Sequence, residues 1–227
     1  MRIASPLNVR ERIELLRSLP YFRPLDDDTL ESVAAQAVRC AYEPEEVIFL
    51  EGEPCAGLFV VHSGHVKIYK ASREGREQIL TIIGPRDSFN DVAVFDGGPN
   101  PASAQAMDAV EVCVIDRPAM INLFARYPRL AQTVVAMLAA RARMLVNMVE
   151  DLSLHSVTAR LAKLLLEQAA QRDAPPLTHQ QMAARLGTVR EMVSRALRDL
   201  ETEGMLRREG RQIVILDRAA LERRSTQ

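Results

Sequence analysis

The chain has 227 residues, of which 48% are hydrophobic and 26% are charged, and its formal net charge is −1. This composition is typical of a globular protein of one or two domains, and it argues against a disordered or strongly basic chain. No apolar run approaches the roughly 18 residues of a membrane span, and residues 1–8 lack the pattern of a signal peptide. The three cysteines have no CxxC spacing, so we expect buried thiols in a cytoplasmic protein and no metal site.

The first half of the chain has the pattern of two short helices followed by β-strands. Residues 9–19 and 29–38 show helical apolar spacing, and the run Asp26–Asp28 offers caps for the second helix. Short apolar runs separated by Gly and Pro indicate strands at residues 47–50, 58–61, 66–70, 79–83 and 110–114. These strands predict an antiparallel β-roll, similar to a jelly roll, within an α+β protein.

A long helix is predicted after the strands, because no Gly or Pro interrupts the chain from Pro128 to about Leu152. Side chains at alternating steps of four and three residues form the seam of a coiled coil. The seam consists of Val134, Leu138, Arg141, Leu145, Met148 and Leu152. A helix packed on its own domain would also show an apolar stripe, but the length and width of this one favour a homodimer. The charge of Arg141 must then find a partner or extend into water.

The last third of the chain has the pattern of a helix-turn-helix. The segments Thr178–Gln181 and Thr188–Glu191 each place a Thr three residues before a Gln or Glu, which is the spacing of a capping box. Gly187 lies between them, where a left-handed residue ends a helix. We therefore predict helices at residues 180–186 and 189–203, joined by a tight turn.

The second of these helices carries an apolar and a polar stripe. The apolar stripe, predicted to be buried, consists of Val189, Val193, Ala196, Leu197 and Leu200. The polar stripe consists of Arg190, Glu191, Ser194, Arg195 and Arg198. Arg can donate hydrogen bonds to guanine, Glu can accept one from the cytosine amino group, and Ser can donate or accept, so these residue types fit a DNA major groove. The alternative is a solvated helix face with local ion pairs. We also predict DNA contacts from Thr178 and Thr188, and from Arg211 in a β-hairpin wing at residues 205–216.

The charge distribution agrees with this organisation. Residues 1–154 hold 16 Lys and Arg against 21 Asp and Glu, whereas residues 155–227 hold 13 against 9. The near-neutral total is therefore the sum of an acidic N-terminal part and a basic C-terminal part. We expect a β-roll sensor domain at residues 1–127, a dimerisation helix and hinge at 128–154, and a DNA-binding domain at 155–227.

Three segments resemble the CRP/FNR family of regulators. Asp87–Pro99 is similar to the ligand cassette of that family, Thr188–Arg195 to its recognition helix and Val157–Arg160 to the segment after its hinge. The resemblance covers essentially the whole chain. It implies a homodimeric, effector-controlled transcription factor that acts with RNA polymerase at a palindromic promoter site. Arg190, Glu191 and Arg195 resemble the pattern of the cyclic AMP receptor branch.

The effector residues of that branch are not all present. The resemblance places the acid of the family at Asp91, its phosphate-binding pair at Asn100-Pro101 and its adenine-contacting hydroxyls at Leu145 and Val146. Asn, Pro, Leu and Val supply neither the cation nor the hydroxyls that a cyclic nucleotide requires. We therefore expect an effector pocket that does not bind cyclic AMP. Its predicted residues are Asp91, Val92, Asn100, Ala102, Leu145 and Val146.

Other branches and other classes of protein are the alternatives. An iron–sulfur cluster is disfavoured because residues 1–39 contain no cysteine. Residues 99–106 resemble the nitrate-respiration regulators, which implies sensing of nitric oxide or carbon monoxide through haem. The candidate axial ligands are Cys55, His62, His65 and Cys113, although the two histidines would face opposite sides of a strand. A β-roll regulatory module that does not bind DNA is another alternative, but it leaves the predicted wing unexplained. The sequence has no HExxH, GxSxG or Walker A motif, so we do not expect an enzyme.

Overall fold

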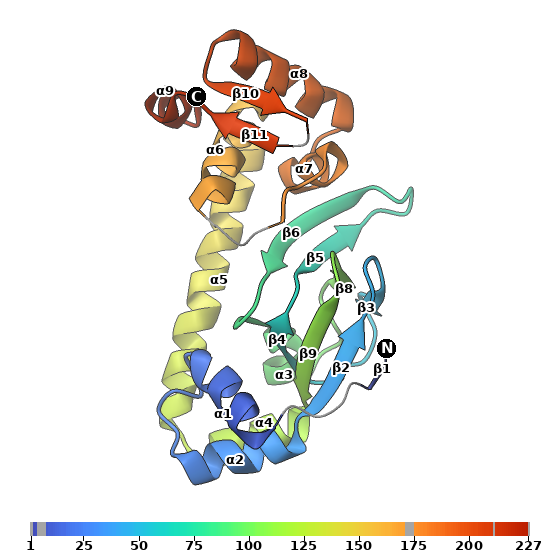
Figure 1. Cartoon of the computed structure of the whole chain (residues 1–227). Helices are drawn as coiled ribbons and strands as arrows, with labels where there is room; N and C mark the ends of the chain where they lie inside the picture. Colours follow the sequence, from blue (N-terminus) through green and yellow to red (C-terminus); the bar gives the residue numbers. More distant parts are fainter. Residues whose placement is uncertain (1, 4–7, 171–174, 211, 227) are drawn as a thin grey trace. The chain divides into compact units, whose positions relative to one another are not determined.

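The computed structural model describes residues 2–3, 8–170, 175–210 and 212–226, and the chain divides into two compact units. The first unit comprises residues 1–70 and 81–142, and the second comprises residues 71–80 and 143–227. Figure 1 shows the elements of both units, coloured along the chain. Among the described residues, no helix combines the length and apolar character needed to cross a membrane.

The first unit contains two β-sheets (Figure 1). One sheet has the strand order β1 (Arg2–Ile3), β2 (Val38–Tyr42), β9 (Val110–Ile115), β4 (Leu58–Ser63) and β7 (Ser88–Phe89). The other has the order β3 (Val47–Phe49), β8 (Ser103–Ala106), β5 (Val66–Ala71) and β6 (Glu77–Ile83). Residues 71–80, from the end of β5 through the turn to the first part of β6, belong to the second unit. Neighbouring strands such as β2 and β9, or β5 and β8, pair antiparallel. The predicted antiparallel roll is therefore confirmed.

Helices complete the first unit. They are α1 (Val9–Ser18), α2 (Asp27–Gln36), α3 (Asp91–Asp96), α4 (Arg117–Arg126) and the first half of α5 (Arg129–Leu154). Asp26 caps α2, as predicted, because its carboxylate accepts a hydrogen bond from the Thr29 backbone N–H at 2.8 Å. The long helix is also confirmed, whereas α4 has no counterpart in the predicted elements.

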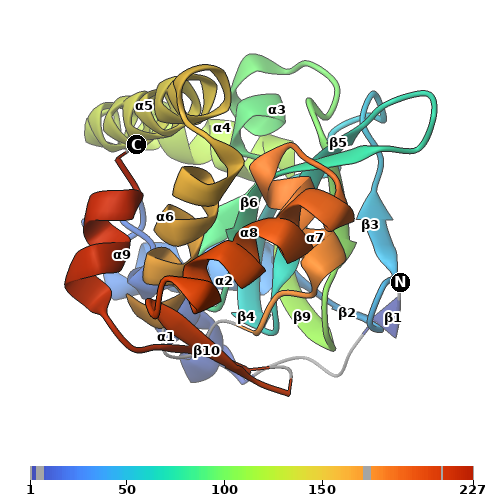
Figure 2. The ribbon, with the colours of Figure 1, turned by 90° about the horizontal axis from the view of Figure 1, so that it is seen from above.

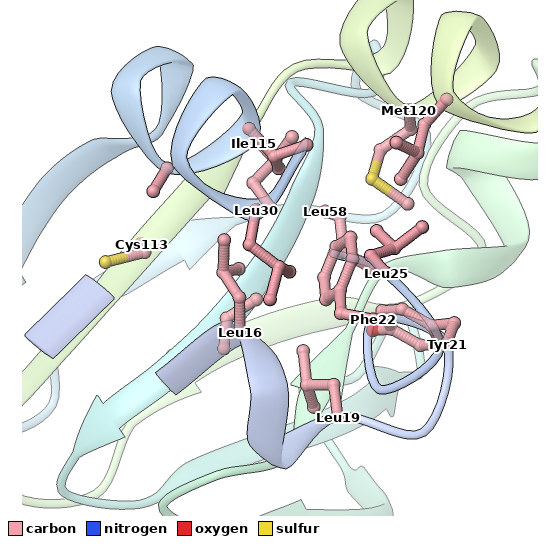
Figure 3. Packing of buried hydrophobic residues seen from close by; sticks show 14 of the residues in the cluster. Leu16, Leu19, Tyr21, Phe22, Leu25, Leu30, Leu58, Cys113, Ile115 and Met120 are labelled. Carbon is pink, nitrogen blue, oxygen red and sulfur yellow. The ribbon is translucent and has the colours of Figure 1, made fainter. Parts of the chain in front are cut away.

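Strand β4 lies between two hydrophobic clusters. Leu58 and Val60 belong to a cluster that includes residues of α1, α2 and α4, whereas Phe59 and Val61 belong to a cluster with members from both sheets. Successive residues of a strand face opposite sides, so a strand buried on both faces is an uninterrupted apolar run. Figure 3 shows the first cluster, with Leu58 among side chains from the helices.

A buried carboxylate connects several segments of the first unit. Asp91 is fully buried, and Arg141 of α5 forms an ion pair with it. Ser88 donates a hydrogen bond to Asp91 Oδ1 at 3.3 Å and receives one from the Tyr21 hydroxyl at 2.5 Å. Arg141 also donates to the carbonyl oxygen of Ser88 at 2.8 Å. The charge at the Arg141 position of the predicted seam is therefore compensated within the same chain.

The second unit contains the winged helix-turn-helix. Besides the second half of α5, its elements are α6 (Val157–Ala170), α7 (His179–Leu186), α8 (Arg190–Thr202), β10 (Leu206–Glu209), β11 (Gln212–Ile215) and α9 (Arg218–Arg224). β10 and β11 pair antiparallel, which confirms the predicted wing. Helices α7 and α8 pack against each other, as Figures 1 and 2 show.

The turn after β5 and the first part of β6 form hydrogen bonds with α7 inside this second unit. Arg76 donates to the carbonyl oxygen of Gly187 at 2.9 Å, and Gln78 donates to that of Arg185 at 3.1 Å. Arg185 in turn donates to the carbonyl oxygen of Leu80 at 3.0 Å. The last carbonyls of a helix lack partners within it, so these bonds stabilise the C-terminal end of α7.

Removal of Arg141 should destabilise the first unit most strongly at neutral pH. Burial raises the pKa of Asp91, while Arg141 and the Ser88 hydroxyl act to lower it, so the folded state carries a costly charge above this raised pKa. In Arg141→Leu the charge loses its cation, and we expect the free energy of unfolding at pH 7 to fall by about 3 kcal/mol. The loss should shrink as the pH falls through the raised pKa, because protonated Asp91 needs no cation.

Urea unfolding followed by near-UV circular dichroism measures this loss, because every Phe and Tyr lies in the first unit. Arg17→Leu is the matched control, since Arg17 pairs with Asp27 at the surface and its removal should cost less than about 1 kcal/mol. The double variant Arg141→Leu/Asp91→Asn should recover most of the stability. Equal losses in the two Arg variants, or a loss that does not depend on pH, would contradict the account.

Candidate functional site

Helix α7 begins and ends as predicted. The Thr178 hydroxyl accepts a hydrogen bond from the Gln181 backbone N–H at 3.2 Å, and the Gln181 side chain accepts one from the Thr178 N–H at 2.9 Å. Gly187 ends the helix with a left-handed φ of 62°. A Cβ at this position would lie 2.7 Å from Leu152 Cδ2 and 2.9 Å from Gln78 Oε1. The left-handed backbone conformation therefore favours glycine, and any larger residue would also have to displace these two side chains.

Helix α8 begins differently from the prediction. Its N-cap is Val189, which has no side-chain capping bond, so the predicted second capping box at Thr188 is wrong. The backbone N–H of Thr188 donates to the carbonyl oxygen of Ala183 at 3.0 Å, which places Thr188 in the turn after α7 and not at the start of α8. Val189 is 50% exposed, so its predicted burial is also wrong.

The rest of the two stripes on α8 agrees with the prediction. Val193, Ala196, Leu197 and Leu200 are buried. The polar stripe lies on the other side of the helix: Arg190, Glu191, Arg195 and Arg198 are exposed and Ser194 is half-buried. The structure thus brings together the five residues of α8 that the sequence marks as DNA contacts.

The arginines of the polar stripe have no ion-pair partner in the described parts of the chain. Arg195 lies one helical turn after Glu191, but the two do not pair, and Arg190 and Arg198 have no carboxylate either. Arg208, by contrast, is held by Glu201 of α8. Exposed cations without carboxylate partners can bind phosphate or base edges, so the alternative of a face neutralised by local ion pairs is not supported.

The other predicted DNA contacts lie around this helix. Thr178 is exposed at the start of α7, and Thr188 is half-buried in the turn. In the wing, Arg207 pairs with Glu209, and the hydrogen bonds that Arg208 donates lower the pKa of Glu201. These two wing arginines are therefore neutralised locally. Arg211 lies outside the described residues.

One residue of this surface carries no signal in the sequence. His179, the first residue of α7, places its Nδ1 atom 3.2 Å from the Ser194 hydroxyl oxygen of α8. Both side chains are half-buried. The two residues are 15 positions apart, a spacing that no helical or strand periodicity predicts, and they meet because α7 packs against α8.

The predicted effector residues are divided between the two units. In the first unit, the Asp91 carboxylate forms an ion pair with Arg141 and accepts a hydrogen bond from Ser88. Asn100 is only 2% exposed. The backbone N–H of Asn100 donates to Glu53 at 2.9 Å, and its side-chain amide donates to the Leu50 carbonyl oxygen at 3.4 Å. Asn100 therefore holds the loop after β3.

The remaining effector candidates offer no polar side chain. Val92 is exposed and Ala102 is buried, both in the first unit. Leu145 and Val146 belong to the second unit, and both are exposed on α5.

Two of the four candidate haem ligands make other contacts. His65 Nδ1 lies 2.9 Å from Asp108 Oδ2, and the Cys55 sulfur accepts a hydrogen bond from the Asn90 amide at 3.5 Å. Burial raises the pKa of the Cys55 and Cys113 thiols, which disfavours the thiolates that bind metal. His62 lies in β4 and His65 follows it before β5. Within the described ranges, no three His, Cys, Asp or Glu side chains are grouped as a metal site.

Comparison with known proteins identifies both parts of the chain. Residues 39–127 match the model of the cyclic nucleotide-binding domain, and residues 159–224 match that of the Crp-like helix-turn-helix domain. A CRP-like cAMP-activated global transcriptional regulator of Mycobacterium tuberculosis is 33% identical over 93% of this chain and 99% of its own. The cyclic AMP receptor protein of Thermus thermophilus is 30% identical over 91% of this chain and 97% of its own.

Solved structures show the same architecture. FixK2 of Bradyrhizobium japonicum matches with a TM-score of 0.73 at 28% identity, covering 82% of this chain and 96% of FixK2. A regulator of the crp/fnr family from Eubacterium rectale matches with a TM-score of 0.77 at 22% identity, covering 93% of this chain and all of its own, and this likeness shows the fold alone. With both domain models and full-length relatives in agreement, the chain belongs to the CRP/FNR family of transcriptional regulators.

Proposed function

We propose that this protein is a homodimer that binds a palindromic promoter site through α8 and acts there with RNA polymerase. The observation that carries the proposal is the exposed stripe of α8, in which Arg190, Arg195 and Arg198 lack ion-pair partners in the described structure. Arg can donate two hydrogen bonds to guanine, and Glu191 can accept one from the cytosine amino group. A stripe that holds both Arg and Glu side chains can recognise base pairs as well as bind phosphate.

The start of α8 supplies further contacts for the DNA backbone. Because Val189 provides no side-chain cap, the first backbone N–H groups of α8 are open to a phosphate oxygen. The Thr188 hydroxyl in the turn and the exposed Thr178 hydroxyl at the start of α7 add uncharged donors. Phosphate contacts of this kind fix the register of a helix in the groove, so that the base contacts fall on defined positions.

We infer that the second half of α5 forms the dimer interface. Six of its apolar side chains are at least 37% exposed: Met144, Leu145, Val146, Val149, Leu152 and Leu154. An apolar strip of this size on a long helix is unfavourable in water, and a second copy of the helix would cover it. The first half differs, because Val134 and Leu138 pack against the core of their own unit.

A dimer through α5 explains how an effector could control DNA binding. The two α8 helices of a dimer must lie about 34 Å apart to enter successive major grooves. A change in the arrangement of the α5 pair alters that spacing, so any ligand that favours one arrangement changes DNA affinity.

We also propose that the effector is not a cyclic nucleotide, although the relatives from M. tuberculosis and T. thermophilus are named for cyclic AMP. In this chain the Asp91 carboxylate is already engaged by Arg141 and Ser88, and Asn100 is bonded to its own loop. The cation beside Asp91 is therefore already paired, so a phosphate would compete with a buried carboxylate for it. None of the described contacts favours haem at the candidate ligands.

Replacement of Arg195 should lower specific DNA affinity. The test first selects an operator from a pool of random duplexes and then measures binding by fluorescence anisotropy. Arg195→Ala should cost about 1–3 kcal/mol on the selected operator and much less on a scrambled duplex. Arg218→Ala is the matched control, because it removes the same charge from an arginine that pairs with Glu222 away from α8. An unchanged preference for the operator in Arg195→Ala would refute the assignment.

A charge on the exposed strip of α5 should separate the subunits. We expect the wild type to sediment as a dimer at micromolar concentration and Val149→Asp to sediment as a monomer, because a buried carboxylate without a partner is costly. Leu50→Asp places the same charge at an exposed apolar site outside α5 and should leave the dimer intact. A dimeric Val149→Asp protein would place the interface elsewhere.

Cyclic AMP should not bind with the affinity expected of the named relatives. Isothermal titration of the wild type with cyclic AMP should give no saturable heat in the micromolar range, because Asn100 and Pro101 supply no cation for the phosphate. The T. thermophilus cyclic AMP receptor protein serves as the positive control for the titration. Micromolar binding by the wild type would overturn this part of the proposal.

A further inference from the structure

We propose that His179 of α7 is a positioning residue that sets the hydrogen-bond polarity of Ser194, and thereby determines which group on a base Ser194 can recognise. The inference rests on the proposed function, in which α8 occupies the major groove. It starts from the 3.2 Å contact between His179 Nδ1 and Ser194 Oγ. None of the other four side chains of the polar stripe has a hydrogen-bond partner from another element among the described residues.

A serine hydroxyl alone is an ambiguous reader of DNA. It has one hydrogen to donate and two lone pairs that accept, and it rotates to suit its surroundings. Adenine and cytosine present an amino donor in the major groove, whereas guanine and thymine present acceptors. An unrestrained Ser194 could therefore satisfy either kind of base edge and would discriminate poorly.

The contact with His179 removes this ambiguity. In a neutral imidazole one ring nitrogen carries a hydrogen and the other accepts. If Nδ1 accepts, it takes the Ser194 hydrogen, and the serine then presents only lone pairs to DNA. Ser194 would then recognise an amino group on adenine or cytosine and would oppose the acceptors of guanine or thymine.

The position of His179 at the start of α7 favours this polarity when DNA is bound. In a helix-turn-helix the first helix lies across the phosphate backbone, and His179 is the first residue of α7, beside the exposed Thr178. Phosphate oxygens only accept hydrogen bonds. A histidine that donates to phosphate through Nε2–H must keep Nδ1 as the acceptor, because the bond at one ring nitrogen fixes the role of the other.

The experiment selects preferred operators from random duplexes with the wild type and with His179→Leu, His179→Asn and Ser194→Ala. The operator position read by residue 194 is the one at which Ser194→Ala loses its base preference. At this position we expect the wild type to discriminate by roughly 3- to 10-fold, the range of one hydrogen bond. His179→Leu removes the acceptor and should reduce this preference to less than about twofold.

Two variants separate this role from a general effect on folding. His179→Asn keeps an oxygen acceptor near the place of Nδ1 and should retain the preference. Gln180→Leu makes the same kind of change at the next, exposed residue of α7 and should also retain it. In a double-mutant cycle, His179→Leu should cause no further loss once Ser194 is Ala. The preferences due to Arg190 and Arg195 should persist in every variant.

Base analogues test the polarity directly. At the position read by residue 194, we replace the preferred base with its analogue that lacks the exocyclic amino group. The wild type should lose roughly 3- to 10-fold in affinity for this duplex, and His179→Leu should not respond. A loss caused instead by removal of a base acceptor would overturn the assigned polarity.

The outcomes distinguish a failure of the proposed function from a failure of the role assigned to His179. A wild type without sequence preference would overturn the proposed function itself. A wild type with clear preferences that are the same in His179→Leu, or that Ser194→Ala leaves unchanged, would overturn only the role of His179.

Discussion

A charged side chain is stable inside a protein only beside an opposite charge, and this constraint separates the structural arginines of the chain from those that face a partner. Arg141 approaches the fully buried Asp91 and so connects α5 with α3, while Ser88 donates a hydrogen bond to the carboxylate and accepts one from Tyr21. The arginines of α8 are exposed and unpaired in the described structure, and they can bind an anion that is not part of the chain. The same residue type thus stabilises the fold in one unit and forms the candidate interface in the other.

This constraint also explains why the fold and the ligand of a family can diverge. Two sheets, their shared core and the long helix depend on apolar burial, which many sequences satisfy, and FixK2 has the same fold at 28% identity. A nucleotide site depends on a few specific polar atoms. In this chain the Asp91 carboxylate is neutralised internally, and Asn100 is bonded to the loop after β3. The proposal that the effector is not a cyclic nucleotide rests on these internal contacts.

Local patterns predicted the parts of the structure that depend on neighbouring residues. The apolar run of β4, the capping box at Thr178 and the glycine that ends α7 were all predictable, because each is decided within a few positions. The same reasoning failed at Thr188, since the spacing of a capping box does not reveal that the N–H of this residue bonds to the end of α7. Contacts across the fold left no signal: Ser88 and Arg141 are 53 positions apart, and only packing brings them together.

If α8 reads DNA as proposed, the contact between His179 and Ser194 makes recognition depend on α7 as well as on α8. An arginine is a donor in every environment, so its preference for guanine or phosphate is a property of the side chain itself. A serine hydroxyl takes its polarity from whichever neighbour holds its hydrogen, and here that neighbour lies on α7. Two regulators with the same residues on α8 but different residues at the start of α7 would then read different base edges. Operator preference in such proteins therefore has to be inferred from both helices together.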